Sequence, residues 1–162
     1  MKLFFIRHGE SEDLKAGNDD ESRVLTDTGK KETVQLAKIL SRLGGKPDAI
    51  IVSPLTRAIQ TAAVIAKKIK YKQELLVFDG LKPDARTDAL IEFLRHNKEF
   101  KRAYIIGHQP FLGQFIAKMT GCGKAPDVAK SSVYLISLDF TETGFSAVID
   151  GYITPCIAKK LV

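Results

Sequence analysis

Short apolar runs of strand length alternate along this chain with longer stretches whose apolar residues recur at helical spacing. Four runs have the length and composition of strands: Lys2–Arg7, Ala49–Val52, Leu75–Phe78 and Arg102–Ile106. Helical spacing follows each of them, over Thr28–Leu43, Pro54–Lys70, Asp88–Arg95 and the segment after Pro110. Strands that alternate with helices predict a mostly parallel sheet covered by helices on both faces.

Local signals refine the ends of these elements. Ser53 followed by Pro54 is typical of an N-cap and a first helical residue, and Gly44-Gly45 is typical of a helix C-terminus. Near the end of the chain, Ser132–Phe140 and Phe145–Ile153 flank a short polar turn and predict an antiparallel hairpin. The predicted fold class is therefore α/β, a three-layer sandwich with a mostly parallel central sheet and a C-terminal antiparallel hairpin.

Length and composition predict one domain without a cofactor. The 162 residues contain no repeat and no Pro/Gly-rich linker, so residues 1–162 are expected to form a single domain. Cys122 and Cys156 lie far apart and in no metal-binding spacing, so we expect free thiols and no bound metal.

Charge and hydropathy narrow the location and the partners. No apolar run approaches the roughly 20 residues that span a bilayer, and the run before Arg7 is shorter than the about 7–15 apolar residues of an export signal. We therefore expect a cytoplasmic protein with no membrane partner. The net charge of +6 fits an anionic partner. Because the lysines are dispersed and no recognition motif is present, an anionic substrate is expected rather than a nucleic acid.

Two histidines and two arginines follow the ends of predicted strands. Arg7 and His8 end the first strand, Arg57 lies in the first turn after the second, and His108 follows the fourth. In open α/β sheets, ligands bind beyond the carboxyl ends of the strands. These four side chains are therefore expected to meet at one edge of the sheet.

Such a cluster suits a phosphate group. Guanidinium groups stay charged and present forked donors that match phosphate oxygens. A neutral imidazole can attack phosphorus through one ring nitrogen when a backbone carbonyl holds the N–H of the other. His8 is the expected nucleophile, and Arg7, Arg57 and a protonated His108 would stabilise the transition state. Neighbouring Gly9 and Gly107 would let the backbone approach the phosphate closely.

Three motifs in this order resemble the histidine phosphatase superfamily: Arg-His-Gly-Glu from Arg7, Ser-Pro-Leu-Thr-Arg-Ala-Ile-Gln-Thr from Ser53, and Gly-His-Gln-Pro from Gly107. The segments Arg23–Gly29, Leu81–Pro83 and Thr154–Cys156 are similar to those of the short SixA-type phosphohistidine phosphatases. The resemblance implies that His8 accepts the phosphoryl group and that Arg7, Arg57 and His108 complete the pocket. The candidate substrate-binding residues are Arg23, Gly9, Gly107 and Ser53.

The chain departs from its larger relatives where they supply a carboxylic acid after the third strand. Here that segment is Gly80-Leu81-Lys82-Pro83, and Asp84, Glu10 and Asp20 remain alternative acids. A positioned acid contributes roughly 10²–10⁴-fold when an alkoxide must leave. A phosphohistidine needs it less, because imidazole, whose pKa is about 6.5, leaves as a neutral base. We therefore expect a protein-borne phosphohistidine as the substrate.

Other interpretations remain open at this point. The same pocket would serve a small-molecule phosphomonoesterase or a mutase, and a chain that only binds phosphoproteins would share its arginines. The acidic residues between positions 10 and 21 are expected to form a solvated loop, or alternatively to steer a basic partner toward the site.

Overall fold

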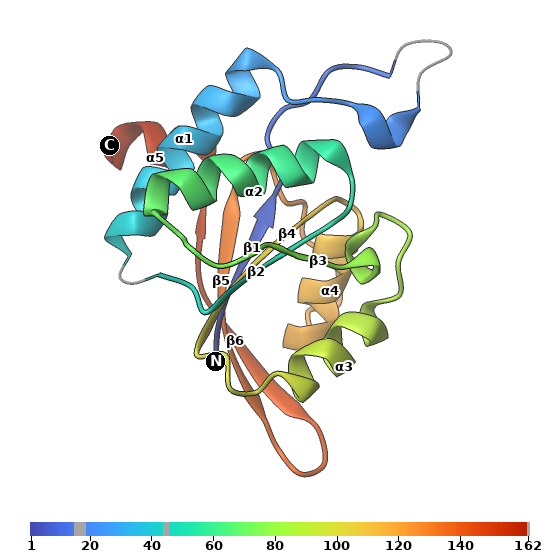
Figure 1. The fold of residues 1–162 in the computed structure, drawn as a ribbon. Helices are drawn as coiled ribbons and strands as arrows, with labels where there is room; N and C mark the ends of the chain where they lie inside the picture. The colour runs from blue at the N-terminus through green and yellow to red at the C-terminus, as the bar shows by residue number, and fades with distance from the viewer. Residues whose placement is uncertain (15–18, 44–45, 162) are drawn as a thin grey trace.

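The computed structural model describes residues 1–14, 19–43 and 46–161 (Figure 1). Six strands form one sheet in the order β3-β2-β4-β1-β5-β6. Their bounds are β1 Lys2–Arg7, β2 Ala49–Val52, β3 Leu76–Val77, β4 Arg102–Gly107, β5 Val133–Phe140 and β6 Phe145–Ile153. Strands β1 to β4 pair in parallel with one another, whereas β5 pairs antiparallel with both β1 and β6. The predicted α/β class and its C-terminal hairpin are confirmed.

Helices cover both faces of this sheet. On one face lie α1 (Asp27–Arg42) and α2 (Thr56–Ile69), and the short α5 (Pro155–Leu161) packs against α1. On the other face lie α3 (Thr87–His96) and α4 (Phe111–Thr120). Figure 1 shows the two sets on opposite sides of the strands, with the β5–β6 hairpin extending beyond the body of the molecule. Two 3₁₀ turns, η1 (Asp20–Ser22) and η2 (Asp79–Leu81), complete the elements.

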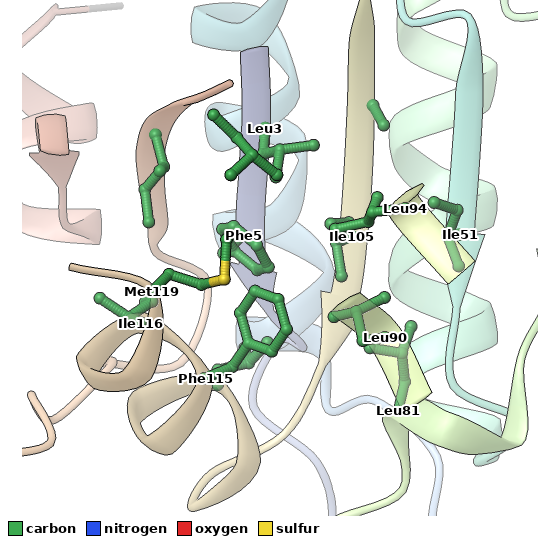
Figure 2. Packing of buried hydrophobic residues seen from close by; sticks show 14 of the residues in the cluster. Leu3, Phe5, Ile51, Leu81, Leu90, Leu94, Ile105, Phe115, Ile116 and Met119 are labelled. Atoms are coloured by element: carbon green, nitrogen blue, oxygen red, sulfur yellow. The ribbon is translucent and has the colours of Figure 1, made fainter. Parts of the chain in front are cut away.

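Strand alternation divides the buried residues between two cores. In β1, Leu3 and Phe5 belong to the core under α3 and α4, whereas Phe4 and Ile6 belong to the core under α1 and α2. Figure 2 shows the first of these cores, where Phe5 meets Phe115 of α4. Successive strand residues point to opposite faces, so a fully apolar strand such as β1 is buried on both sides. A slip of one residue would exchange the two sets of side chains, and this fixes the register.

The cap of α2 and the presence of α5 differ from the predicted elements. Helix α2 begins at Thr56 with Leu55 as its N-cap, so the prediction that Ser53 caps this helix was wrong. The physical reason is that the Ser53 hydroxyl contacts the ring of His108 instead. Helix α5 was not predicted, because seven residues are too few to show clear helical periodicity. The predicted helix end at Gly44-Gly45 lies outside the described residues.

The connections after β1 and β4 leave the carboxyl edge of the sheet toward opposite faces. The chain leaves β1 for α1 on one face of the sheet and leaves β4 for α4 on the other face. Because β1 and β4 are direct neighbours, their following loops diverge at a topological switch point, where ligands bind in sheets of this kind. None of the described helices is long and apolar enough to cross a membrane.

Candidate active site

His8 stands at the end of β1 with its ring orientation fixed by the backbone. Its Nδ1 lies 2.7 Å from the carbonyl oxygen of Gly9, and since a carbonyl can only accept, Nδ1 carries the proton. The backbone N–H of His8 donates to the carbonyl of Gly107 at 3.1 Å, and its carbonyl accepts from the N–H of Ser131 at 3.2 Å. The ring is therefore held as the tautomer that has its lone pair on Nε2.

The surroundings of His8 keep this imidazole neutral. Its side chain is buried, and burial lowers its pKa from 6.5 to about 4. The hydrogen bond to Gly9 opposes that effect, while the positive charges of Arg57, Arg7 and Lys130 add to it. At neutral pH the Nε2 lone pair is therefore available for attack or for hydrogen bonding.

His108 follows β4 and lies beside His8, with 4.9 Å between the two ring centroids. Its Nε2 is 2.7 Å from the hydroxyl of Ser53, which also accepts from the N–H of Leu55 at 3.4 Å. Its Nδ1 is buried and meets no hydrogen-bond partner among the residues that the structure describes. Ser53 was a candidate substrate contact, and the structure places it behind the ring of His108.

The surroundings of His108 favour its neutral form, whereas the sequence predicts a protonated ring in the transition state. Burial is the largest cause and lowers the pKa of His108 to about 2. His8 and the guanidinium groups of Arg57, Arg7 and Arg23 act in the same direction. The sequence does not reveal how deeply the His108 ring is buried, so it could not predict the pKa of this ring. A bound phosphate dianion would oppose these positive charges and raise the pKa of His108.

Arg57 lies in the first turn of α2 and is 3% exposed. Its Nε donates to Nε2 of His8 at 3.3 Å. Its Nη1 donates to the carbonyl oxygen of Asp20 at 2.7 Å, and its Nη2 donates to Oδ2 of Asp20 at 2.9 Å. Every nitrogen of this guanidinium therefore has a protein partner, one of which is the expected nucleophile.

Arg7 and Arg23 approach the site from different sides. Arg7 is the last residue of β1, and its Nη1 donates to the carbonyl of Val128 at 2.7 Å and lies 3.9 Å from Oδ1 of Asp127. Arg23 places its Nε 2.9 Å from Oδ1 of Asp20. Arg23 and Arg57 therefore hold the two oxygens of one carboxylate.

Of the three carboxylates considered as acids, the structure brings Asp20 to the site. Glu10 accepts a hydrogen bond from the hydroxyl of Thr26 at 2.8 Å, at the start of α1. Asp84 is exposed in the loop that precedes α3. Within residues 1–14, 19–43 and 46–161, no three His, Cys, Asp or Glu side chains are grouped so that they could hold a metal ion.

The surroundings of Gly9 and Gly107 differ in how closely protein atoms approach them. A Cβ on Gly9 would lie 2.8 Å from Oγ1 of Thr33 and 2.9 Å from the carbonyl of Gly29, so the close approach at Gly9 is to helix α1. A Cβ on Gly107 would meet Leu112 at 3.4 Å, which is an ordinary contact. Packing against α1 therefore explains the glycine at position 9, and the role of both glycines at a phosphate stays a prediction.

Comparisons with known proteins agree with this arrangement. Residues 3–82 match the model of the histidine phosphatase superfamily, branch 1, and this span includes Arg7, His8 and Arg57. The chain belongs to the histidine phosphatase superfamily. An uncharacterised protein from a Picosynechococcus species is 35% identical over 117 residues, which cover 71% of this chain and 70% of that protein.

Solved structures of this superfamily share the fold over nearly the whole chain. The protein histidine phosphatase SixA, complexed with tungstate, superposes with a TM-score of 0.88 at 25% identity and covers 96% of this chain and 98% of its own. An α-ribazole-5′-phosphate phosphatase candidate from Escherichia coli K-12 shares the fold at 17% identity, with a TM-score of 0.75 and coverages of 96% and 98%.

One relative with a named activity matches only in part. The mitochondrial serine/threonine-protein phosphatase Pgam5 of Drosophila yakuba is 39% identical over 75 residues, which cover 46% of this chain and 25% of that protein. The match therefore spans a quarter of the length of Pgam5. As a histidine phosphatase superfamily member, the present chain is a phosphatase.

Sequence reasoning missed the segment that supports this histidine phosphatase site from the β5 side. Ser131 is buried, has a positive φ of 54° and donates its N–H to the carbonyl of His8. The Val128 carbonyl holds Arg7, and the charge of Lys130 acts on His8. These residues form an irregular stretch before β5, and no periodicity or motif marks them in the sequence. Positive φ in a non-glycine residue is uncommon and clusters at functional sites.

Proposed function

We propose that this chain is a phosphohistidine phosphatase that hydrolyses phosphohistidine on a protein through a covalent phospho-His8 intermediate. The observation that carries the proposal is the state of His8. Its Nδ1–H is held by the Gly9 carbonyl, its pKa of about 4 keeps the ring neutral, and its Nε2 faces Arg57 beside His108. A neutral ring with its proton held on Nδ1 and its lone pair on Nε2 is what a histidine nucleophile requires.

In the first step, Nε2 of His8 attacks phosphorus. A bond forms between this nitrogen and phosphorus while the bond from phosphorus to the substrate nitrogen breaks. The substrate imidazole leaves as a neutral base, with its ring proton already in place or taken from water. Arg57 and Arg7 neutralise the charge on the equatorial oxygens.

In the second step, water attacks the phosphorus of phospho-His8. The P–Nε2 bond breaks, inorganic phosphate leaves, and His8 returns to its neutral form with the proton still on Nδ1. The bound phosphate raises the pKa of His108, because its negative charge opposes the positive charges of Arg57, Arg7 and Arg23 that lower this pKa. His108 then stabilises both transition states as a hydrogen-bond donor through a ring nitrogen.

The absence of a free acid beside the nucleophile favours a P–N bond over a phosphate ester. Among the described residues, the carboxylate nearest to this chemistry is that of Asp20, which two guanidinium groups hold. In these two ion pairs the Asp20 carboxylate serves as an acceptor for guanidinium donors rather than as a donor toward a leaving group. An imidazole leaving group does not need that proton as strongly.

The comparison with SixA supports the same substrate class. That protein histidine phosphatase shares its fold with this chain over almost the full length of both, and it was solved with tungstate, a tetrahedral oxyanion. We also infer that the reaction needs no metal ion and that the enzyme works in the cytoplasm on a phosphorylated protein.

The test is phosphate release from a phosphohistidine-bearing protein, measured beside a phosphoserine peptide and phosphoglycerate. We expect rapid release from phosphohistidine alone. His8→Ala should abolish it, and His96→Ala should leave it unchanged because His96 is an exposed residue at the end of α3. Trapping of acid-labile, base-stable phosphate on His8 during turnover would separate an enzyme from a phosphoprotein-binding module.

A phosphomonoesterase is the second candidate, and the partial match to Pgam5, a serine/threonine-protein phosphatase, favours it. Equal or faster release from phosphoserine or phosphoglycerate, still dependent on His8, would establish this alternative. It would overturn the P–N preference while leaving His8 as the nucleophile.

A further inference from the structure

We propose that the carboxylate of Asp20 is a built-in competitor that occupies the phosphate position and that the substrate must displace it. This inference rests on the proposed function, because it assumes that Arg57 and Arg23 bind phosphate. Asp20 belongs to η1, a single 3₁₀ turn that contacts the N-terminal part of α2. Figure 1 shows the turn beside the end of α2 at which Arg57 lies.

The contacts of Asp20 imitate those expected of a phosphate. One oxygen accepts from Nη2 of Arg57 at 2.9 Å, and the other lies 2.9 Å from Nε of Arg23. Two guanidinium groups repel each other unless an anion lies between them, and here the anion is a side chain of the same protein. A carboxylate and a phosphate both present paired oxygens to the forked guanidinium donors.

This contact also occupies the nucleophile. With Nη1 and Nη2 on Asp20, Arg57 directs its Nε at the Nε2 lone pair of His8. That lone pair is the one that must attack phosphorus, so the state with Asp20 bound is not competent for the first step. His8, Arg57 and His108 are each buried in this state. To bind Arg57, a substrate phosphate therefore has to replace the hydrogen bonds of its guanidinium group to the Asp20 carboxylate and to His8.

Additional contacts hold η1 in place. Lys82, from the segment after β3, lies 3.4 Å from Oε1 of Glu21, and Asp19 caps the turn by accepting from the N–H of Glu21. The Asp20 backbone carbonyl also binds Arg57. These tethers keep the carboxylate of Asp20 at high local concentration opposite the two arginines, so it competes with any free anion.

The consequence is selection by charge. A substrate phosphoryl group carries two negative charges and three oxygens, and it can replace the single charge and two oxygens of Asp20 with a net gain. A monoanionic ligand such as a carboxylate offers nothing more than the resident side chain does. Asp20 is therefore a specificity-determining residue that lowers the affinity for all anions and excludes weak ones.

The experiment measures binding of inorganic phosphate and of tungstate by calorimetry in three forms of the full chain. Asp20→Asn keeps the shape of the side chain and removes its charge. Glu12→Gln removes one charge from the same acidic stretch, at an exposed side chain whose residue meets Arg23 only through its backbone carbonyl. We expect Asp20→Asn to bind phosphate at least about tenfold more tightly than the wild type, and Glu12→Gln to stay within about twofold.

A second readout distinguishes a competitor from a residue that merely shapes the pocket. In Asp20→Ala, acetate should occupy the vacated position between the arginines and weaken phosphate binding, whereas acetate should have no such effect on the wild type. Circular dichroism of each variant establishes that it is folded.

Each outcome decides something. Phosphate affinity that is unchanged or weaker in Asp20→Asn would overturn the competitor role, and a wild type that binds phosphate in that same experiment would leave the proposed function standing. Failure of all three forms to bind phosphate or tungstate would instead remove the phosphate pocket itself, and with it the proposed function.

Discussion

The two histidines of this site, His8 and His108, are held by a different kind of structure from two of its arginines, Arg57 and Arg23. His8 and His108 follow adjacent parallel strands, and the groups that orient their rings, the Gly9 carbonyl and the Ser53 hydroxyl, also stand at strand ends. Arg57 and Arg23 are instead held by Asp20, a residue of one short turn. The histidine half of the site, His8 and His108, is part of the sheet. The arginine half, Arg57 and Arg23, depends on contacts that an anion can replace.

The difference teaches how a pocket can be both rigid and exchangeable. The backbone N–H of Ser53 donates to the carbonyl of Ile106, and that of His8 donates to the carbonyl of Gly107. The positions of the two histidine rings therefore change only if this edge of the sheet changes. An ion pair with a half-exposed carboxylate costs little to exchange for another anion, because the incoming anion supplies the charge that the two guanidinium groups lose. The histidine half therefore sets the chemistry, and the arginine half sets which anion enters.

The largest effect that tests this division is expected from Arg57→Lys. The ammonium keeps the charge that helps to hold His8 neutral but cannot reach His8 and two phosphate oxygens at once. We expect kcat/KM to fall roughly 10²–10³-fold, the range seen when one transition-state donor is removed. Steady-state hydrolysis of a phosphohistidine protein provides the measurement.

The matched control is Arg86→Lys, because Arg86 lies just before α3 with its side chain 87% exposed. This variant should retain wild-type rates. Near-normal turnover in Arg57→Lys would mean that charge alone is needed there, and the geometric part of the comparison would then fail.

The histidine half was largely predictable from sequence, and the reason is the sheet. Arg7, His8 and His108 each adjoin an apolar run that reads clearly as a strand, and parallel strands bring their carboxyl ends to one edge. Arg57 was placed by the same rule, since the first turn of the helix after β2 lies at that edge. In these cases a local signal and the topology pointed to the same position.

The arginine half was not predictable to the same degree. Asp20 and Arg57 are 37 positions apart, and no periodicity relates a residue of a short turn to one of a helix. Ser53-Pro54 satisfied the pattern of a helix start, yet the hydroxyl of Ser53 is used by His108, 55 positions away. The charge state of His108 depends on burial, which only the packed structure determines.

A second test concerns how the burial of His8 and His108 makes the free energy of unfolding depend on pH. Both have a lowered pKa in the folded chain, whereas in the unfolded chain each takes up a proton near pH 6.5. Between these values the unfolded state binds more protons, so the stability of the fold decreases as the pH falls from about 6.5. For His8, with a folded pKa of about 4, we expect a loss of about 3 kcal/mol between pH 6.5 and pH 4.

Urea unfolding of the wild type and of His8→Asn at a series of pH values isolates this contribution. The free energy of unfolding should fall less steeply with acid in His8→Asn, while His96→Asn should keep the wild-type slope because His96 is exposed. Identical slopes in all three proteins would show that His8 titrates normally, and the neutral nucleophile would lose its support.

The smallest expected effect is that of Ser53→Ala, which probes how the sheet holds His108. The Ser53 hydroxyl is fully buried, accepts from the N–H of Leu55 and lies 2.7 Å from Nε2 of His108, so its hydrogen-bonding direction fixes which ring nitrogen carries the proton. Removing this hydroxyl leaves Nε2 of His108 without that partner, and we expect kcat to fall about tenfold, in line with about 1–2 kcal/mol for a lost buried hydrogen bond. KM should change little, because the arginines still bind the phosphate.

Ser132→Ala is the control, since its buried hydroxyl donates to the carbonyl of Ala129 rather than to a histidine. Equal losses in both variants would mean that any buried hydroxyl near this edge supports the fold, whereas a loss of kcat confined to Ser53→Ala would place the control of the His108 proton in the sheet.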